Sequence, residues 1–175
     1  MATDAITTRK LEDLEKLKAL QARQPRLIQI LRVTGQPPAE IELNLVLPTA
    51  RSTAFPAERQ AQTRVKIQLP QRYPFEEPLV SIQSTIWNPN VYASGRVCLG
   101  SRWTVTENLE LLARRIMKII ALDPLIVNVQ SPANREAASW YAALLRRQPG
   151  LFPTAQVEAL LAAPAPRPIA WHNLK

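Results

Sequence analysis

Residues 41–47, Ile-Glu-Leu-Asn-Leu-Val-Leu, place an apolar side chain at every second position. Alternation with this period predicts a β-strand with one buried face. Residues 65–69, Val-Lys-Ile-Gln-Leu, repeat the pattern, and the apolar runs 27–33 and 78–82 predict one strand before this pair and one after it. Because the four runs follow one another in sequence, they are expected to form an antiparallel meander.

Apolar residues at helical spacing lie on both sides of the strand region. Residues 4–22 predict an amphipathic helix that Pro25 ends. Its basic residues fit either a solvated face or a docking face for an acidic partner. Residues 105–120 predict an apolar central helix that packs on the sheet, with Thr104 and Glu107 at the spacing of a capping box.

The C-terminal third of the chain predicts two more helices. Ser131-Pro132 has the cap chemistry that opens a helix, and a short amphipathic helix is expected at 154–162. A run of strands followed by helices indicates an α+β domain. We therefore predict one domain over residues 1–150, a short C-terminal helix within 151–163 and a Pro-rich tail over 164–175.

The composition excludes several kinds of site. The chain has one cysteine, Cys98, and one histidine, His172, so a Cys/His zinc cluster, an intramolecular disulfide and a two-His metal site are ruled out. Its four glycines are too far apart for a G-x-G-x-x-G or Walker-type phosphate loop. No metal and no cofactor are therefore expected.

Charge and hydropathy bear on location and partners. The 175 residues contain no apolar run of 18 and begin without the apolar core of a signal peptide, so a cytoplasmic protein with a reduced thiol and no membrane partner is expected. The net charge of +8 fits nucleic acid, an acidic protein partner or nothing specific. A nucleic-acid partner is disfavoured because the arginines are spread along the chain without an aromatic-basic motif.

Cys98 lies in an irregular segment, residues 84–103, and a long irregular segment inside a domain is often functional. Taken alone, a single cysteine is most often a small buried hydrophobe. Here Gly95 and Gly100 flank it and permit close approach of another backbone, while Asn90 offers an amide donor. Cleaving an amide would need an acid and a base, whereas exchanging a thioester needs chiefly an exposed sulfur and an oxyanion donor. The residues therefore favour acyl transfer through a thioester.

Four motifs closely resemble the core of the ubiquitin-conjugating enzymes. That family has Y-P-F-x-x-P, H-P-N, G-x-[IV]-C-L and a following Trp; this chain has residues 73–78 (Tyr-Pro-Phe-Glu-Glu-Pro), 88–90 (Asn-Pro-Asn), 95–99 (Gly-Arg-Val-Cys-Leu) and Trp103. Asn90 precedes Cys98 by eight residues, as in the family. The resemblance spans about residues 5–150 and implies the family's α+β fold, with an N-terminal helix, a four-stranded antiparallel meander, a central helix and C-terminal helices.

The resemblance also implies roles for individual residues. Cys98 would accept a ubiquitin-like protein from an activating enzyme as a thioester, and Asn90 would stabilise the oxyanion when a lysine of the target protein attacks. Ser131 falls where the family often has Asp or Ser, placed to orient or deprotonate that lysine; a simple helix N-cap is its alternative reading. The first helix would meet the activating enzyme.

Three departures from the family pattern matter. Asn88 replaces a His that is thought to hold the loop by hydrogen bonds, some of which Asn can still make. Trp103 follows Cys98 by only five residues, so the loop after the cysteine is shorter than in eukaryotic members. Residues 104–106, Thr-Val-Thr, replace S-P-A on the surface that, with Phe75, normally receives a ligase, which leaves a ligase partner uncertain. These features resemble a bacterial member, whose setting would be an antiviral defence operon.

A second class of function remains open. A catalytically inactive member of the same fold would only bind a ubiquitin-like protein, without a thioester. Inactive variants generally lack the cysteine, so the presence of Cys98 at the family's distance from Asn90 favours the enzyme.

Overall fold

Four antiparallel strands form one sheet in chain order: β1 (Ile28–Thr34), β2 (Glu40–Leu45), β3 (Thr63–Gln68) and β4 (Leu79–Ile82). The computed structural model describes residues 4–100, 102–152 and 154–163. The pairing of Ile41 with Ile67 puts apolar side chains of neighbouring strands on one face. The predicted meander is confirmed.

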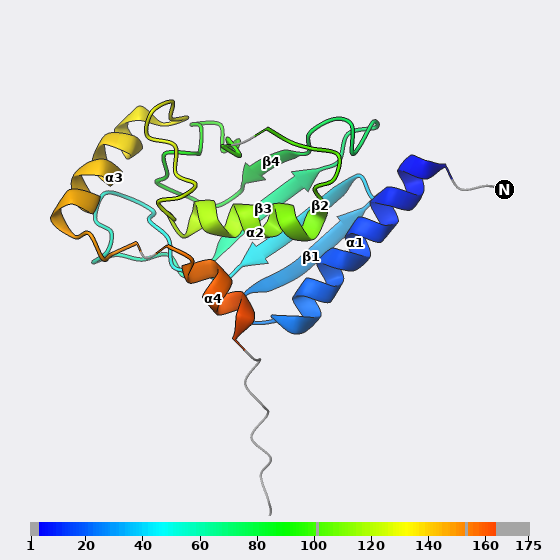
Figure 1. Ribbon diagram of the computed structural model, residues 1–175, viewed down its shortest axis with the longest axis horizontal. Coiled ribbons are helices and arrows are strands. Elements are labelled where there is room, and N and C mark those ends of the chain that lie inside the picture. Colours follow the sequence, from blue (N-terminus) through cyan, green and yellow to red (C-terminus); the bar gives the residue numbers. More distant parts are fainter. Residues whose placement is uncertain (1–3, 101, 153, 164–175) are drawn as a thin grey trace, which may run out of the picture.

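Two helices cover one face of this sheet, as Figure 1 shows. They are α1 (Ala5–Arg23) beside β1 and α2 (Leu109–Ile120) across the strands. Two further helices follow, α3 (Arg135–Arg147) and α4 (Gln156–Ala162). The α+β fold, with its N-terminal helix, sheet and later helices, is therefore confirmed.

The hydrophobic core lies between α1, α2 and the covered face of the sheet. Its fully buried side chains come from all three layers, for example Leu17, Ile41 and Ile116. The opposite face of the sheet is open, with Leu31 and Arg64 exposed. None of the helices that the structure describes is both long and apolar enough to cross a membrane.

A buried polar cluster ties α1 to the turn that precedes β4. The Tyr73 hydroxyl donates to the carboxylate of Asp13, which also accepts from Arg9 Nε at 2.7 Å. Burial, reinforced by the hydrogen bond to Asp13, raises the pKa of Tyr73 above its ordinary value, so the phenol stays protonated. The cluster satisfies a carboxylate that is fully buried.

The predicted start of the central helix is wrong. Thr104–Glu107 forms a turn, and α2 begins at Leu109 after the N-cap Asn108, whose Oδ1 accepts the amide of Leu111 at 3.0 Å. The Glu107 carboxylate does not complete a capping box, because it binds Arg115 at 2.6 Å. Arg9 donates to the carbonyls of Val105 and Glu107, which holds this segment as a turn. Tertiary hydrogen bonds thus outweigh the local cap.

The predicted start of the third helix is also wrong. Ser131 does not cap it: α3 begins at Arg135, after the N-cap Asn134. The amides of Ala133 and Asn134 donate instead to the Pro89 carbonyl at 2.8 and 3.1 Å. Residues 131–134 are therefore drawn toward the loop that carries Asn90.

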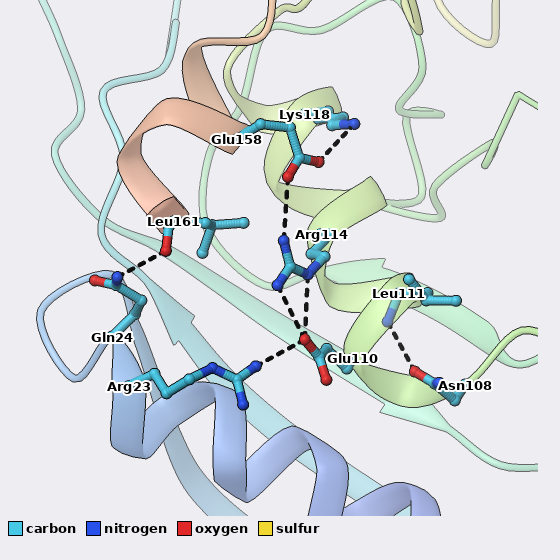
Figure 2. A network of polar contacts seen from close by, with 9 residues as sticks. All are labelled: Arg23, Gln24, Asn108, Glu110, Leu111, Arg114, Lys118, Glu158 and Leu161. Atoms are coloured by element: carbon cyan, nitrogen blue, oxygen red, sulfur yellow. Dashed lines mark hydrogen bonds and ion pairs between the residues drawn. The ribbon is translucent and has the colours of Figure 1, made fainter. Parts of the chain in front are cut away.

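The short helix expected at 154–162 is present as α4 and packs onto α2. Figure 2 shows the polar network between them: Glu158 accepts from Arg114 at 3.1 Å and from Lys118 at 2.8 Å. Arg114 and Arg23 of α1 both bind Glu110, so three helices share one chain of ion pairs. Val157 is fully buried in the main core. The Pro-rich tail predicted for 164–175 lies outside the described residues.

The caps of α2 give a direct stability test. Asn108→Ala should lower the free energy of unfolding by about 1 kcal/mol, because the amide of Leu111 loses its acceptor. Thr104→Ala is the matched control and should change it by less than about 0.5 kcal/mol. Urea titrations followed by circular dichroism measure both. A larger loss in Thr104→Ala would mean that the capping box forms after all.

Candidate active site

The segment after β4 is irregular in sequence but ordered by backbone hydrogen bonds. Val97 N donates to Val80 O at 2.9 Å, and Ile82 N donates to Gly95 O at 2.8 Å, so this segment pairs with β4. Gly95 has a φ of +85°, and a Cβ there would lie 2.7 Å from Ile82 O. The close backbone approach predicted for this glycine is confirmed. The contact with β4 fixes the chain three residues before Cys98.

Cys98 lies partly exposed in a groove of about 600 Å³ on the surface of the domain. The groove is lined by residues 77–80 at the start of β4, by residues within 92–100, and by Arg102 and Asn128. The two residues next to Cys98, Val97 and Leu99, are buried and hold the backbone against the core. The thiol is therefore accessible while its backbone is anchored, which is the placement that a nucleophile needs.

Asn90 is fully buried and is not among the residues that line the groove, but it binds the backbone of Cys98 and Asn128, which are. Its Nδ2 donates to Cys98 O at 3.0 Å and makes a longer contact, 3.5 Å, with Ile126 O. Its Oδ1 accepts the amide of Asn128 at 3.1 Å, and its own carbonyl accepts the amide of Cys98 at 2.7 Å. One carboxamide thus joins the cysteine segment to residues 126–128.

Asn88 holds the loop of Asn90 against the end of α2. Its Nδ2 donates to Ile119 O at 2.7 Å, and its Oδ1 accepts the amide of Asn90 at 2.9 Å. Both hydrogen bonds are buried, so water does not compete with them for the carboxamide of Asn88. The prediction that an Asn at this position can still hold the loop is confirmed.

Asn128 is a site residue that sequence reasoning missed. It lines the groove with Cys98, and its Oδ1 accepts the amides of Gln130 and Ser131 at 3.1 and 2.9 Å. The only sequence signal was its place in a loop rich in Asn, Ser and Pro.

Ser131 is linked to the site through its backbone amide, which donates to Asn128 Oδ1. Ser131 is exposed, and it is not among the residues that line the groove. Asp123 is buried, and its Oδ1 accepts the amide of Leu125 at 2.9 Å in the turn that follows α2.

The groove is poor in groups that transfer protons. Among its described lining residues Glu77 is the one carboxylate, and none is a histidine. Hydrolysis of an amide at Cys98 would lack the acid and base it requires. Exchange between a thiol and a thioester needs neither, because one thiolate replaces another.

The turn before β4 and Trp103 pack together beside this groove. Trp103 Nε1 donates to Pro74 O at 2.7 Å, and its ring lies 5.9 Å from that of Tyr73. Phe75 projects from the same turn and is largely exposed. The shortened loop after Cys98 is thereby anchored at its far end.

A protein-family model described as "Ubiquitin-conjugating enzyme" matches residues 18–148, which is more than half of the chain. The chain therefore belongs to the ubiquitin-conjugating enzyme family. This confirms the family inferred from the four motifs.

Individual relatives match over shorter stretches. A ubiquitin-conjugating enzyme E2 of African swine fever virus is 31% identical over 98 residues, covering 49% of this chain and 42% of the relative. Ubiquitin-conjugating enzyme E2 2 of Debaryomyces hansenii is 38% identical over 81 residues, covering 45% of this chain and 46% of the relative. In these matches the chain spans less than half the length of the relatives.

Solved structures confirm the fold. The structure of S. cerevisiae Ubc12 aligns with a TM-score of 0.61 and 20% identity, covering 91% of this chain and 79% of that one. Human ubiquitin-conjugating enzyme E2 G1 aligns with a TM-score of 0.52 and 17% identity, covering 67% and 98%.

The Asn90 hydrogen bonds predict a large contribution to stability. Asn90→Ala should lower the free energy of unfolding by about 1–3 kcal/mol, because the Cys98 carbonyl and the Asn128 amide lose their partner. Ser131→Ala should change it by less than about 0.5 kcal/mol, since that side chain is exposed. Chemical denaturation of the two variants tests this, and equal midpoints would contradict the structural role of Asn90.

Proposed function

We propose that this chain is a conjugating enzyme that carries a ubiquitin-like protein on Cys98. The modifier arrives from an activating enzyme as a C-terminal thioester, and its acyl group moves to the Cys98 sulfur. It is then transferred to a lysine of a target protein. The observation that carries the proposal is the partly exposed cysteine in an open groove, held there by the buried Asn90.

Both chemical steps suit the residues of the groove. In the first, the Cys98 thiolate forms a new C–S bond while the thiolate of the activating enzyme leaves. In the second, the nitrogen of a neutral lysine amine bonds to the thioester carbon, the C–S bond to Cys98 breaks, and the proton that the nitrogen loses passes to solvent. The Cys98 thiolate is a good leaving group, so no acid has to protonate it first. The match to the ubiquitin-conjugating enzyme family supports this two-step reaction.

Asn90 is proposed to have two roles in this reaction. Its carboxamide positions the Cys98 segment, and one of its Nδ2 hydrogens donates to the oxyanion that forms during transfer. The contact to Ile126 O, at 3.5 Å, is the weaker of its two donor contacts and is the one that the oxyanion would replace. An oxyanion donor of this kind contributes about a hundredfold to a thousandfold in rate.

Ser131 is proposed to orient the incoming lysine. Its support is its position beside Asn128, which lines the groove.

The first helix is proposed to contact the activating enzyme, while a separate ligase remains an open partner. The proposed setting is a bacterial antiviral operon in the cytoplasm, supported by the shortened loop and composition, and the neighbouring genes test it directly.

The alternative function is a binding module that holds a ubiquitin-like protein without a thioester. The exposure of Cys98 in the groove weighs against it, because a binding module needs no accessible thiol there. One charging experiment separates the two.

Charging is the first functional prediction. Incubation with its activating enzyme, ATP and the cognate ubiquitin-like protein should give an adduct on a non-reducing gel that thiol reductant removes. Cys98→Ser should give at most an adduct that resists reductant, and Cys98→Ala should give none. No adduct on the wild-type chain, together with retained binding of the ubiquitin-like protein, would leave only the binding module.

Transfer from the charged enzyme tests Asn90. Asn90→Ala should charge normally but discharge to free lysine about a hundredfold more slowly, since the oxyanion loses its donor. Asn88→Ala is the matched control: it removes the bonds to Ile119 O and Asn90 N but keeps the Asn90 carboxamide. Single-turnover discharge should therefore slow much less in Asn88→Ala. Equal losses in both variants would show that Asn90 acts only by holding the loop.

A further inference from the structure

Two arginines without an ion pair to any described residue line the groove that contains Cys98. Arg96 precedes the cysteine by two residues and Arg102 follows it by four, and both are exposed. Several other arginines of the chain are engaged, among them Arg9 with Asp13 and Arg115 with Glu107. The two groove arginines are thus available to a ligand.

The backbone of Arg96 is fixed so that its side chain faces the same way as Cys98. Arg96 forms an antiparallel bridge with Ser81, and its carbonyl accepts the amide of Tyr92 at 2.9 Å. In such an extended segment successive side chains point to opposite sides. Val97, between the two, points into the core, so Arg96 and Cys98 both point into the groove.

The charge of the groove is positive. Arg96 and Arg102 carry two positive charges, and Glu77 is the one acidic side chain among the described lining residues. Glu77 reduces this field but does not cancel it. A guanidinium offers a planar fork of N–H donors that matches a carboxylate and is more selective for it than a simple point charge.

An acyl group bonded to the Cys98 sulfur must run through this groove, because the sulfur is reached from there. We propose that Arg96 and Arg102 select a modifier whose C-terminal tail carries an acidic residue close to its reacting carboxyl group. This inference rests on the proposed thioester at Cys98 and names the class of substrate that it accepts. A basic tail would be repelled by the same two groups.

Peptide thioesters test the inference without knowledge of the modifier. Three fluorescent six-residue peptides that end in two glycines are prepared as benzyl thioesters, with glutamate, glutamine or lysine at the third and fourth positions. The Cys98 thiol gives up its proton, its sulfur bonds to the peptide acyl carbon, and benzyl thiolate leaves and takes up a proton. Loading rates of the full chain are measured by non-reducing gels in 50 mM and 500 mM salt, with Cys98→Ala as the blank.

The wild-type chain should load the glutamate peptide about five- to tenfold faster than the lysine peptide, with the glutamine peptide between them. The preference should shrink in 500 mM salt, because these charges are exposed and screened. A variant with both Arg96→Glu and Arg102→Glu should prefer the lysine peptide. The control variant is Arg51→Glu with Arg146→Glu, which has the same net charge as the groove variant but changes two exposed residues outside the groove. It should keep the wild-type preference.

The other outcomes separate the inference from the proposed function. If all three peptides load on Cys98 at equal rates, the arginines do not select the tail, while the thioester chemistry stands. If the control variant also loses the preference for the glutamate peptide, the net charge of the protein selects the peptide and the groove arginines do not, so the inference is wrong. If charge affects only later discharge to a lysine peptide, the arginines read the acceptor and the inference is wrong. If none of the peptides loads, the thioester proposal itself fails.

Discussion

The buried carboxamide of Asn90 is the constraint on which the site depends. It joins two segments that are far apart in sequence, since Nδ2 reaches Cys98 O and Oδ1 receives the amide of Asn128. Both backbone groups would otherwise lack a partner at the edge of the core, where an unmade hydrogen bond is costly. Asn88 in turn fixes this loop to the end of α2. The accessible thiol is therefore held by the core, although no regular helix or strand carries it.

The small number of proton-transfer groups in the groove is consistent with the proposed thioester chemistry. A site that cleaved amides would need a histidine or a paired carboxylate near the thiol. Thioester exchange instead needs exposure, an anchored backbone and a donor for the oxyanion, and those are the features that the residues around Cys98 provide. For the proposed acyl carrier, a groove in which Glu77 is the one carboxylate among the described lining residues also offers few bases that could activate water.

The sheet and the main elements could be predicted from the sequence because period-two and helical patterns report burial directly. The family could be inferred because four motifs carry it, and the eight-residue spacing of Asn90 and Cys98 placed them in one site, where they are hydrogen-bonded. The helix starts at Thr104 and Ser131 were wrong because hydrogen bonds from Arg9 and to the Pro89 carbonyl hold those segments, and no local pattern contains such partners. Asn128 was missed for the same reason: its role comes from a backbone bond to Asn90 across the fold.

The C-terminal helix reaches the site through α2. Asn88 binds the carbonyl of Ile119, so the loop of Asn90 moves with the last turn of α2. Glu158 of α4 binds Arg114 and Lys118 on that same helix (Figure 2), and Val157 is buried against it in the main core. Residues 156–162 thus support the helix to which the Asn90 loop is bound, although none of these seven residues lines the groove.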